Sequence, residues 1–267
     1  MKKILCIALS LIMIVSLFAC MQISAFAADD EEKSDIAYVK ENGKLVVGIT
    51  DFEPMDYKDT DGKWIGFDAE LATDFAYALG VDVEFIEIDW DNKILELNNK
   101  SIDCIWNGMT LTDEVMEAAD CSNPYMLNAQ VIVIKADAAE KYESVEDMKD
   151  LVFAVEAGSA GEAAVKDLGY EATPVQTQAQ ALLEVNAGTS DAAVIDLLMA
   201  AAMTGEGTDY ANLTYTFHLN EEEYGVAMRQ GSDLVEALNA FFKFSYVTGN
   251  MDELAEDYGL TGSVIEQ

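Results

Sequence analysis

Arginine and histidine are almost absent from this chain of 267 residues. Its 15 basic residues include a single arginine, Arg229, against 50 Asp and Glu, and the only histidine is His218. The formal net charge of −35 argues against nucleic acid as a partner, because phosphate binding requires clustered Lys and Arg. It argues equally against an anionic membrane surface.

Cysteine is scarce as well. Cys6 and Cys20 fall in the N-terminal segment, which leaves Cys104 and Cys121 in the body of the chain. Two cysteines and one histidine are too few for a structural zinc site, so no metal is predicted. We expect no cofactor either, because no cofactor motif occurs. Cys104 and Cys121 form either a disulfide or two buried thiols. A disulfide requires that their Cα atoms lie within about 7 Å of each other.

The N-terminus has the pattern of a secretory signal. Lys2 and Lys3 precede an apolar run over 4–19, and 25–27 (AFA) fits an ordinary cleavage site. Residues 1–27 are therefore predicted to be a signal peptide. No other segment reaches about 18 apolar residues, so no transmembrane helix is predicted.

A second processing site competes with the first. Residues 17–20 (LFAC) resemble a lipobox, in which cleavage before Cys20 leaves that cysteine lipidated at the mature N-terminus. Both alternatives predict an extracytoplasmic protein, at the cell surface or in the periplasm, with or without a lipid anchor. Residues 28–35 are polar without an apolar period and are predicted to be a flexible tether.

Strand-like and helix-like segments alternate along the rest of the chain. Residues 44–49 form a compact apolar run, and Leu71, Phe75 and Leu79 then recur at helical spacing before Gly80. Such alternation predicts an α/β fold with parallel sheets covered by helices. Further strands are expected at 81–86, 102–106, 129–135, 151–155, 171–175, 191–195, 213–217 and 223–228.

The order of these segments predicts two lobes. The strands at 129–135 and 223–228 bracket the second set of βα units, so the chain crosses between lobes twice. We expect residues 36–130 with 227–267 in lobe 1 and residues 131–226 in lobe 2. The two bracketing strands would form the hinge.

Short motifs in a fixed order then indicate a family. They are 45–48 (LVVG), Pro54, 66–68 (GFD), 103–112 (DCIWNGMTLT), 121–125 (CSNPY), 155–159 (VEAGS), 191–196 (DAAVID) and 224–227 (YGVA). Over about residues 36–260 the chain resembles extracytoplasmic amino-acid-binding proteins of ABC importers, solute-binding protein family 3. The resemblance implies the type II periplasmic-binding-protein fold, whose two lobes close on a ligand by hinge bending.

The resemblance also implies a first-lobe half of a binding site. Phe52 and Trp90 would be aromatic walls around the ligand side chain. Asn107, Gly108 and Thr110 would hydrogen-bond the α-amino and carboxylate groups. Their loops are expected at the carboxyl ends of strands, where open α/β sheets bind ligands.

The second lobe would complete this site. Ser159 and Ala160 would offer a hydroxyl and a backbone N–H to the ligand carboxylate, and Asp196 would pair with the α-ammonium. The family usually places a carboxylate-binding arginine five residues after the binding threonine, and here that residue is Val115. Glu156 stands where some relatives have a neutral or basic side chain.

The missing arginine leaves three alternatives for the ligand. In the first, neutral donors alone hold the ligand carboxylate. In the second, the ligand is cationic and its second positive charge lies against Glu156 or Asp51. In the third, the ligand has no α-carboxylate. Charge-assisted hydrogen bonds are worth roughly 1.5–3 kcal/mol, against about 1 for neutral ones, so the loss matters. We expect a neutral or cationic ligand to be preferred over an acidic one.

The function implied by the resemblance is that of a substrate-binding protein. It would capture a polar amino acid or related small solute and deliver it, as a monomer, to an ABC permease. Two alternatives remain, an extracytoplasmic enzyme and a ligand-sensing module on the same fold. The enzyme is disfavoured, because His218 lies in no motif and no Ser-His-Asp set occurs.

Overall fold

The computed structural model describes residues 34–267. The predicted signal peptide, the alternative lipidation site at Cys20 and most of the predicted tether lie outside the described residues. Ser34 and Asp35, expected at the end of that tether, instead begin an ordered helix, α2 (Asp35–Asn42). The Ser34 hydroxyl accepts a hydrogen bond from the Ala37 N–H (3.1 Å) and so caps this helix.

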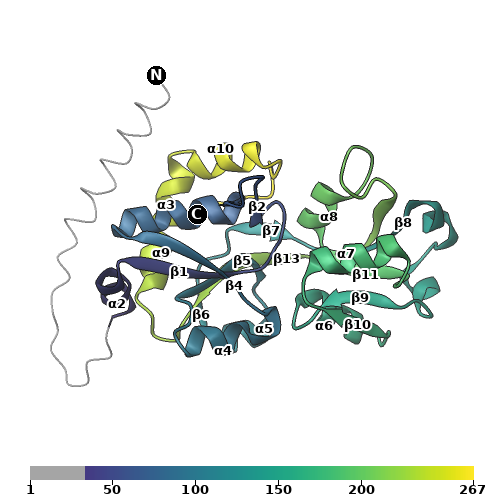
Figure 1. Cartoon of the computed structure of the whole chain (residues 1–267), viewed down its shortest axis with the longest axis horizontal. Coiled ribbons are helices and arrows are strands. Elements are labelled where there is room, and N and C mark those ends of the chain that lie inside the picture. The colour runs from purple at the N-terminus through teal and green to yellow at the C-terminus, as the bar shows by residue number, and fades with distance from the viewer. Residues whose placement is uncertain (1–33) are drawn as a thin grey trace.

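Two α/β lobes lie side by side, as Figure 1 shows, and the α/β class predicted from the sequence is confirmed. In the first sheet, β4, β1 and β5 are parallel to one another. The next strand, β13, is antiparallel to β5 and also pairs in antiparallel fashion with β6 and β7. Its strands are β4 (Asp82–Glu87), β1 (Lys44–Ile49), β5 (Cys104–Thr110), β13 (Glu222–Met228), β6 (Asp120–Cys121) and β7 (Met126–Asn128).

Helices cover this sheet, and a short hairpin lies beside it. They are α3 (Phe67–Leu79), α4 (Lys93–Asn98), α5 (Asp113–Ala118), α9 (Leu234–Val247) and α10 (Asn250–Asp257), with the 3₁₀ turn η1 (Trp90–Asn92) and the hairpin β2 (Tyr57–Lys58) and β3 (Trp64–Ile65). The helical pattern that predicted α3 reflects its packing, since Leu71, Phe75 and Leu79 are all buried.

The second sheet has the order β10-β9-β11-β8-β12, with β8 antiparallel to both of its neighbours. Its strands are β10 (Ala172–Val175), β9 (Phe153–Glu156), β11 (Ala192–Asp196), β8 (Gln130–Lys135) and β12 (Leu213–His218). Around it lie α6 (Ala160–Asp167), α7 (Gln178–Ala187), α8 (Leu197–Met203) and the 3₁₀ turns η2 (Ala136–Lys141) and η3 (Val145–Met148).

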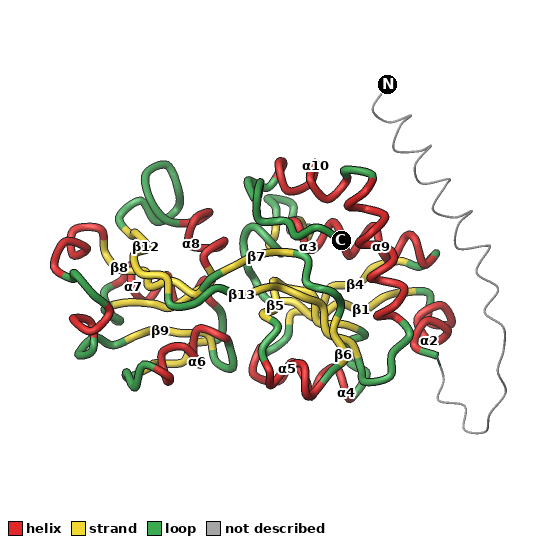
Figure 2. Tube along the Cα trace, turned by 180° about the vertical axis from the view of Figure 1, so that it is seen from behind, coloured by secondary structure: helices red, strands yellow, loops and turns green. Residues whose placement is uncertain are grey.

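The chain passes between the sheets at two neighbouring places, seen from behind in Figure 2. The first lies between β7 and β8, and the second between β12 and β13. All of β13 pairs with first-sheet strands, so the boundary expected at 226/227 falls inside that strand and the crossing lies at 219–221.

One local expectation is corrected by the structure, and two acidic side chains prove to be buried. Residues 107–110, expected to be a loop, continue β5, because β13 pairs alongside them up to Thr110. Asp68 is fully buried in the first turn of α3, whose N-cap is Gly66. Asp56 is fully buried too.

Cys104 and Cys121 are free thiols in the structure. Strand β13 separates them, because Cys104 pairs with Met228 on one side and Cys121 with Ala227 on the other. Two strand spacings put their Cα atoms roughly 9–10 Å apart, beyond the reach of a disulfide. Of the two alternatives left open by the sequence, the structure has the pair of thiols.

Candidate functional site

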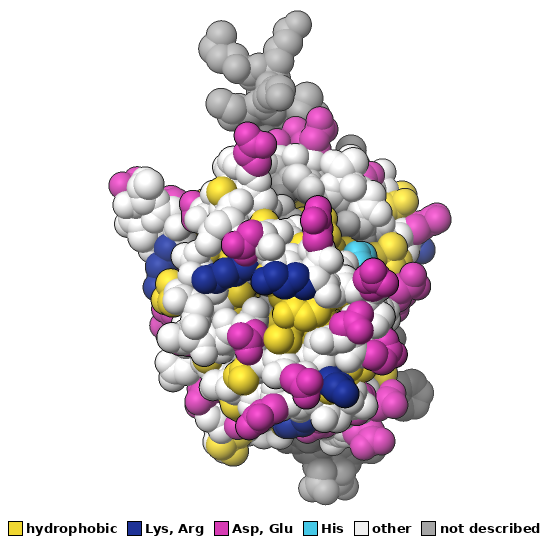
Figure 3. All heavy atoms as spheres, turned by 90° about the vertical axis from the view of Figure 1, so that its right-hand side faces the viewer, with side chains coloured by type: hydrophobic (Ala, Val, Ile, Leu, Met, Phe, Trp, Pro, Cys, Tyr) yellow, Lys and Arg dark blue, Asp and Glu magenta, His cyan; other side chains and the backbone are white. Residues whose placement is uncertain are grey.

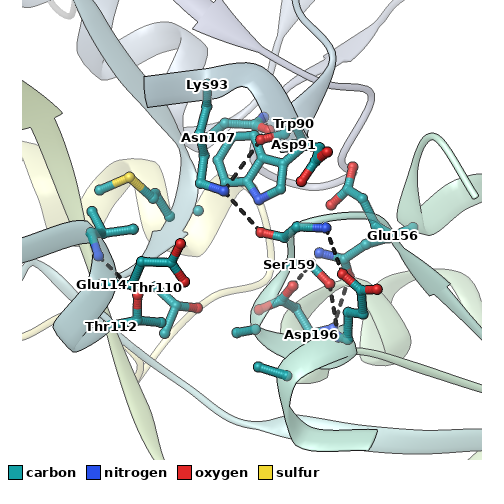
Figure 4. Close-up of a pocket in the computed structure, with 18 of the residues that line it drawn as sticks. Trp90, Asp91, Lys93, Asn107, Thr110, Thr112, Glu114, Glu156, Ser159 and Asp196 are labelled. Atoms are coloured by element: carbon teal, nitrogen blue, oxygen red, sulfur yellow. Dashed lines mark hydrogen bonds between the residues drawn. The ribbon is translucent and has the colours of Figure 1, made fainter. Parts of the chain in front are cut away.

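A cavity of about 470 Å³ lies between the two lobes. Both lobes line it, and the close-up in Figure 4 shows side chains from each side facing one another. All nine residues that the sequence proposed for ligand binding line this cavity: Phe52, Trp90, Asn107, Gly108, Thr110, Glu156, Ser159, Ala160 and Asp196. The structure therefore brings the proposed set together in space.

Two aromatic side chains form part of the first-lobe wall. Phe52 follows β1 and packs edge-on against Tyr224, with ring centroids 6.4 Å apart. Gly108 makes room for it, because a Cβ there would lie 2.5 Å from Phe52 Cε1, and its φ of +52° also favours glycine. Trp90 begins η1 and is largely buried.

The first-lobe donors expected to hold the ligand are engaged within the protein. The Asn107 side chain donates to Asp56 Oδ2 (2.7 Å) and accepts from the Thr50 N–H (2.9 Å). The Gly108 N–H donates to Asp68 Oδ2 (2.6 Å). These three bonds fix β5 to its neighbours rather than point at a ligand.

Thr110 is likewise engaged, since its hydroxyl donates to Glu222 Oε1 (2.8 Å). Asn128 and Gln130 also donate to that oxygen, at 2.7 and 2.8 Å. Glu222 was not singled out from the sequence. It starts β13 beside the interlobe crossing, so it ties the hinge to the cavity wall.

In the second lobe, Ser159 lies at the cavity edge and caps α6. Its hydroxyl oxygen accepts from the Glu162 N–H (3.1 Å), which leaves its O–H free to donate to a ligand. Ala160 begins α6, and N–H groups in the first turn of a helix have no intrahelical partner. These two groups fit the donor role that the resemblance implies.

Asp196 ends β11 and is saturated with donors. Its Oδ1 accepts from Tyr224 (2.9 Å), Gln130 (3.0 Å) and Asn128, and its Oδ2 accepts from Gln178. Burial, and then the nearby charge of Glu222, raise the pKa of Asp196 well above its ordinary value. Gln178, the first residue of α7, was missed by sequence reasoning.

Glu156 ends β9 and is only 2% exposed. Its Oε1 has no hydrogen-bond partner among the described residues. Burial, and then the charge of Asp196, raise the pKa of Glu156 to about 8. A buried carboxyl with an unused oxygen in a cavity wall is well placed to accept a hydrogen bond from a ligand.

The charge of the cavity wall is predominantly acidic. Five acidic side chains line the cavity, against two lysines: Asp91, Glu114, Glu156, Glu162 and Asp196 against Lys93 and Lys166. Val115, where the family arginine was expected, lines it as a neutral side chain. The only arginine, Arg229, lies elsewhere, ion-paired with Asp35 and Asp103 at 3.0 Å each.

The outer surface of lobe 2 is also acidic. Figure 3 shows acidic side chains spread over its end with a few lysines between them, and His218 is exposed there.

Among residues 34–267, no group of three or more His, Cys, Asp or Glu side chains is arranged to hold a metal ion. No helix within that range is long and apolar enough to cross a membrane.

Fold and cavity together define a two-lobed solute-binding protein with a cavity between its lobes. The chain belongs to the bacterial extracellular solute-binding proteins, family 3, whose model matches residues 45–261. The resemblance inferred from the sequence motifs is thereby confirmed.

Individual relatives span nearly the whole chain. It is 30% identical, over 95% of its own length and 96% of the relative's, to the ABC transporter glutamine-binding protein GlnH of Bacillus subtilis (strain 168). Its structure resembles a mutant of ArgBP from T. maritima (TM-score 0.79, 32% identity, 84% and 99% of the two chains), a protein also solved in an arginine-bound form.

A further solved neighbour is related to an enzyme. The ancestral amino-acid-binding protein AncCDT-1, described as a precursor of cyclohexadienyl dehydratase, matches with a TM-score of 0.77 and 33% identity. The match covers 84% of this chain and 99% of that one.

Proposed function

We propose that this protein captures a polar amino acid with a neutral or cationic side chain and delivers it to an ABC permease. The observation that carries the proposal is the interlobe cavity lined by buried Glu156 and Asp196, with Val115 at the position of the usual arginine. A ligand held from both lobes favours the closed arrangement, which is the form presented to a permease.

The electrostatics of the cavity favour a positive ligand group. Burial raises the pKa values of Glu156 and Asp196, and among residues 34–267 neither carboxylate has a positively charged partner within 4.0 Å. A ligand ammonium or guanidinium group supplies the missing counter-charge, whereas a second ligand carboxylate adds repulsion. Relatives named for glutamine and arginine support the same ligand class.

We propose that the mature protein acts as a monomer outside the cytoplasmic membrane, exported by the N-terminal signal and held there by a lipid if Cys20 is the cleavage site. Family membership supports the extracellular location.

An enzyme on this fold is the second candidate, and one observation favours it. Glu156 is buried in the cavity with a pKa near 8, as general acids and bases often are, and one structural neighbour is an ancestor of a dehydratase. The two candidates differ in turnover, because a carrier returns its ligand unchanged.

A thermal-shift screen of the mature protein against all common amino acids, polyamines and small amides tests the proposal. Binding raises the melting temperature by mass action, and we expect the response from polar neutral or cationic amino acids. Mass spectrometry of the best ligand after incubation should recover it unchanged. A new product would favour the enzyme, and no response to any amino acid would contradict the proposal.

A further inference from the structure

Lys93 is a cation in the cavity that the sequence motifs did not reveal. It begins α4, one helical turn after Trp90, and is only 9% exposed. Its Nζ donates to the Trp90 carbonyl (3.2 Å) and, across the lobe boundary, to the Gly158 carbonyl (2.8 Å). Figure 4 shows these two bonds, with the ammonium group between Trp90 and the segment that leads into Ser159.

This ammonium group has no counter-ion in contact. Within residues 34–267, no carboxylate oxygen lies within 4.0 Å of Lys93 Nζ. Asp91, Glu114 and Glu156 act on it only from farther away, and burial lowers the pKa of Lys93. A buried charge without a counter-ion is unfavourable, so a single carboxylate placed against Lys93 Nζ would be stabilised there.

The Lys93 ammonium group keeps one N–H donor that no hydrogen bond within the described part of the chain uses. An ammonium group has three N–H donors, and two are used by the carbonyls of Trp90 and Gly158. The Gly158 carbonyl immediately precedes Ser159 and Ala160, the second-lobe groups with donors to spare. Lys93 Nζ, which also lies over the Trp90 ring at 4.9 Å from its centroid, is therefore at the same end of the cavity as those two donors.

We propose that Lys93 binds the α-carboxylate of the ligand, performing the role that relatives assign to an arginine at the position of Val115. The carboxylate lies between Lys93 of the first lobe and Ser159 and Ala160 of the second. The ammonium lies toward Glu156 and Asp196. This inference rests on the proposed function, and it adds that the ligand keeps a free carboxylate.

The test compares each amino acid with its carboxamide, which lacks the negative charge. L-Arginine, L-glutamine and L-histidine, each paired with its amide, are titrated by calorimetry into the wild type, Lys93→Met and Lys93→Arg. Lys243→Met, an exposed lysine on α9, is the matched control. Circular dichroism checks the fold of each variant.

For the pair that binds best, Lys93→Met should weaken the free acid about tenfold or more and change the amide by less than about threefold. Lys93→Arg should retain the preference for the acid, and Lys243→Met should leave both affinities unchanged. Equal losses of affinity for acid and amide in Lys93→Met, or a wild type that binds both equally, would overturn the role of Lys93. Neither result would affect the proposed function. If none of the six probes binds, the best amino acid of the thermal-shift screen and its amide take their place, and a wild type that binds no amino acid at all would overturn the proposed function and this inference with it. If Lys93→Met does not fold, Lys93→Arg decides, since losing the acid preference would refute the role.

Discussion

Replacing Glu156 with glutamine should change how the stability of the empty protein depends on pH. The Glu156 side chain is 2% exposed, and its pKa is raised from 4.5 to about 8. Between pH 4.5 and about pH 8, Glu156 is deprotonated in the unfolded chain but keeps its proton in the folded protein. The free energy of unfolding therefore falls as the pH rises through this window. Below pH 4.5 the group makes no difference, and above about pH 8 the loss is complete.

The size of the effect follows from the same interval. At about 1.4 kcal/mol per pH unit, an interval of about 3.5 units corresponds to roughly 5 kcal/mol, and relaxation of the cavity lowers this to several kcal/mol. Glutamine has nearly the same shape and does not titrate. The variant should therefore be more stable than the wild type by several kcal/mol at pH 8.5, and close to it at pH 4.5.

Urea denaturation at several pH values between 4.5 and 9, without ligand, measures this difference. Repulsion from the large net charge is nearly common to both proteins and so largely cancels in the comparison. Glu236→Gln, an exposed glutamate on α9, is the matched control for the loss of one carboxylate. A difference between Glu156→Gln and the wild type that does not change with pH would refute the reasoning that Glu156 is held protonated in the ligand-free protein.

Two further substitutions test the cavity wall and the single arginine. Gly108→Ala places a Cβ 2.5 Å from Phe52 Cε1 at a φ of +52°, so calorimetry should show at least about tenfold weaker ligand binding, and unchanged affinity would contradict the role of Phe52. Arg229→Met leaves Asp35 and Asp103 buried without their partner, so urea denaturation should show a loss of about 3–5 kcal/mol with an unaltered ligand Kd. A stability change below about 1 kcal/mol would show that this buried ion pair is dispensable.

The sequence predicted the fold well because its signals are local. Strand β1 has the predicted bounds, and Leu71, Phe75 and Leu79, whose spacing predicted a helix, lie in α3. The proposed binding residues meet at one cavity because they lie near the carboxyl ends of strands in two facing sheets. That juxtaposition follows from topology, which the alternation of elements already indicates.

What the sequence could not predict depends on partners far along the chain. Asp68 is buried because Tyr125 and Gly108, 57 and 40 residues away, donate to its carboxylate. Thr110 is occupied by Glu222 from a strand that pairs with β5. Lys93 looks like an ordinary helix residue until folding brings the Gly158 carbonyl to its ammonium group.

The central claim is that the cavity holds an amino acid by its positive groups without an arginine on its wall. Calorimetric titration of the mature protein with L-arginine, L-glutamine and L-glutamate tests it most directly. We expect stoichiometric binding of arginine or glutamine, and binding of glutamate that is at least about tenfold weaker. Glutamate binding as tightly as either of the others would contradict it.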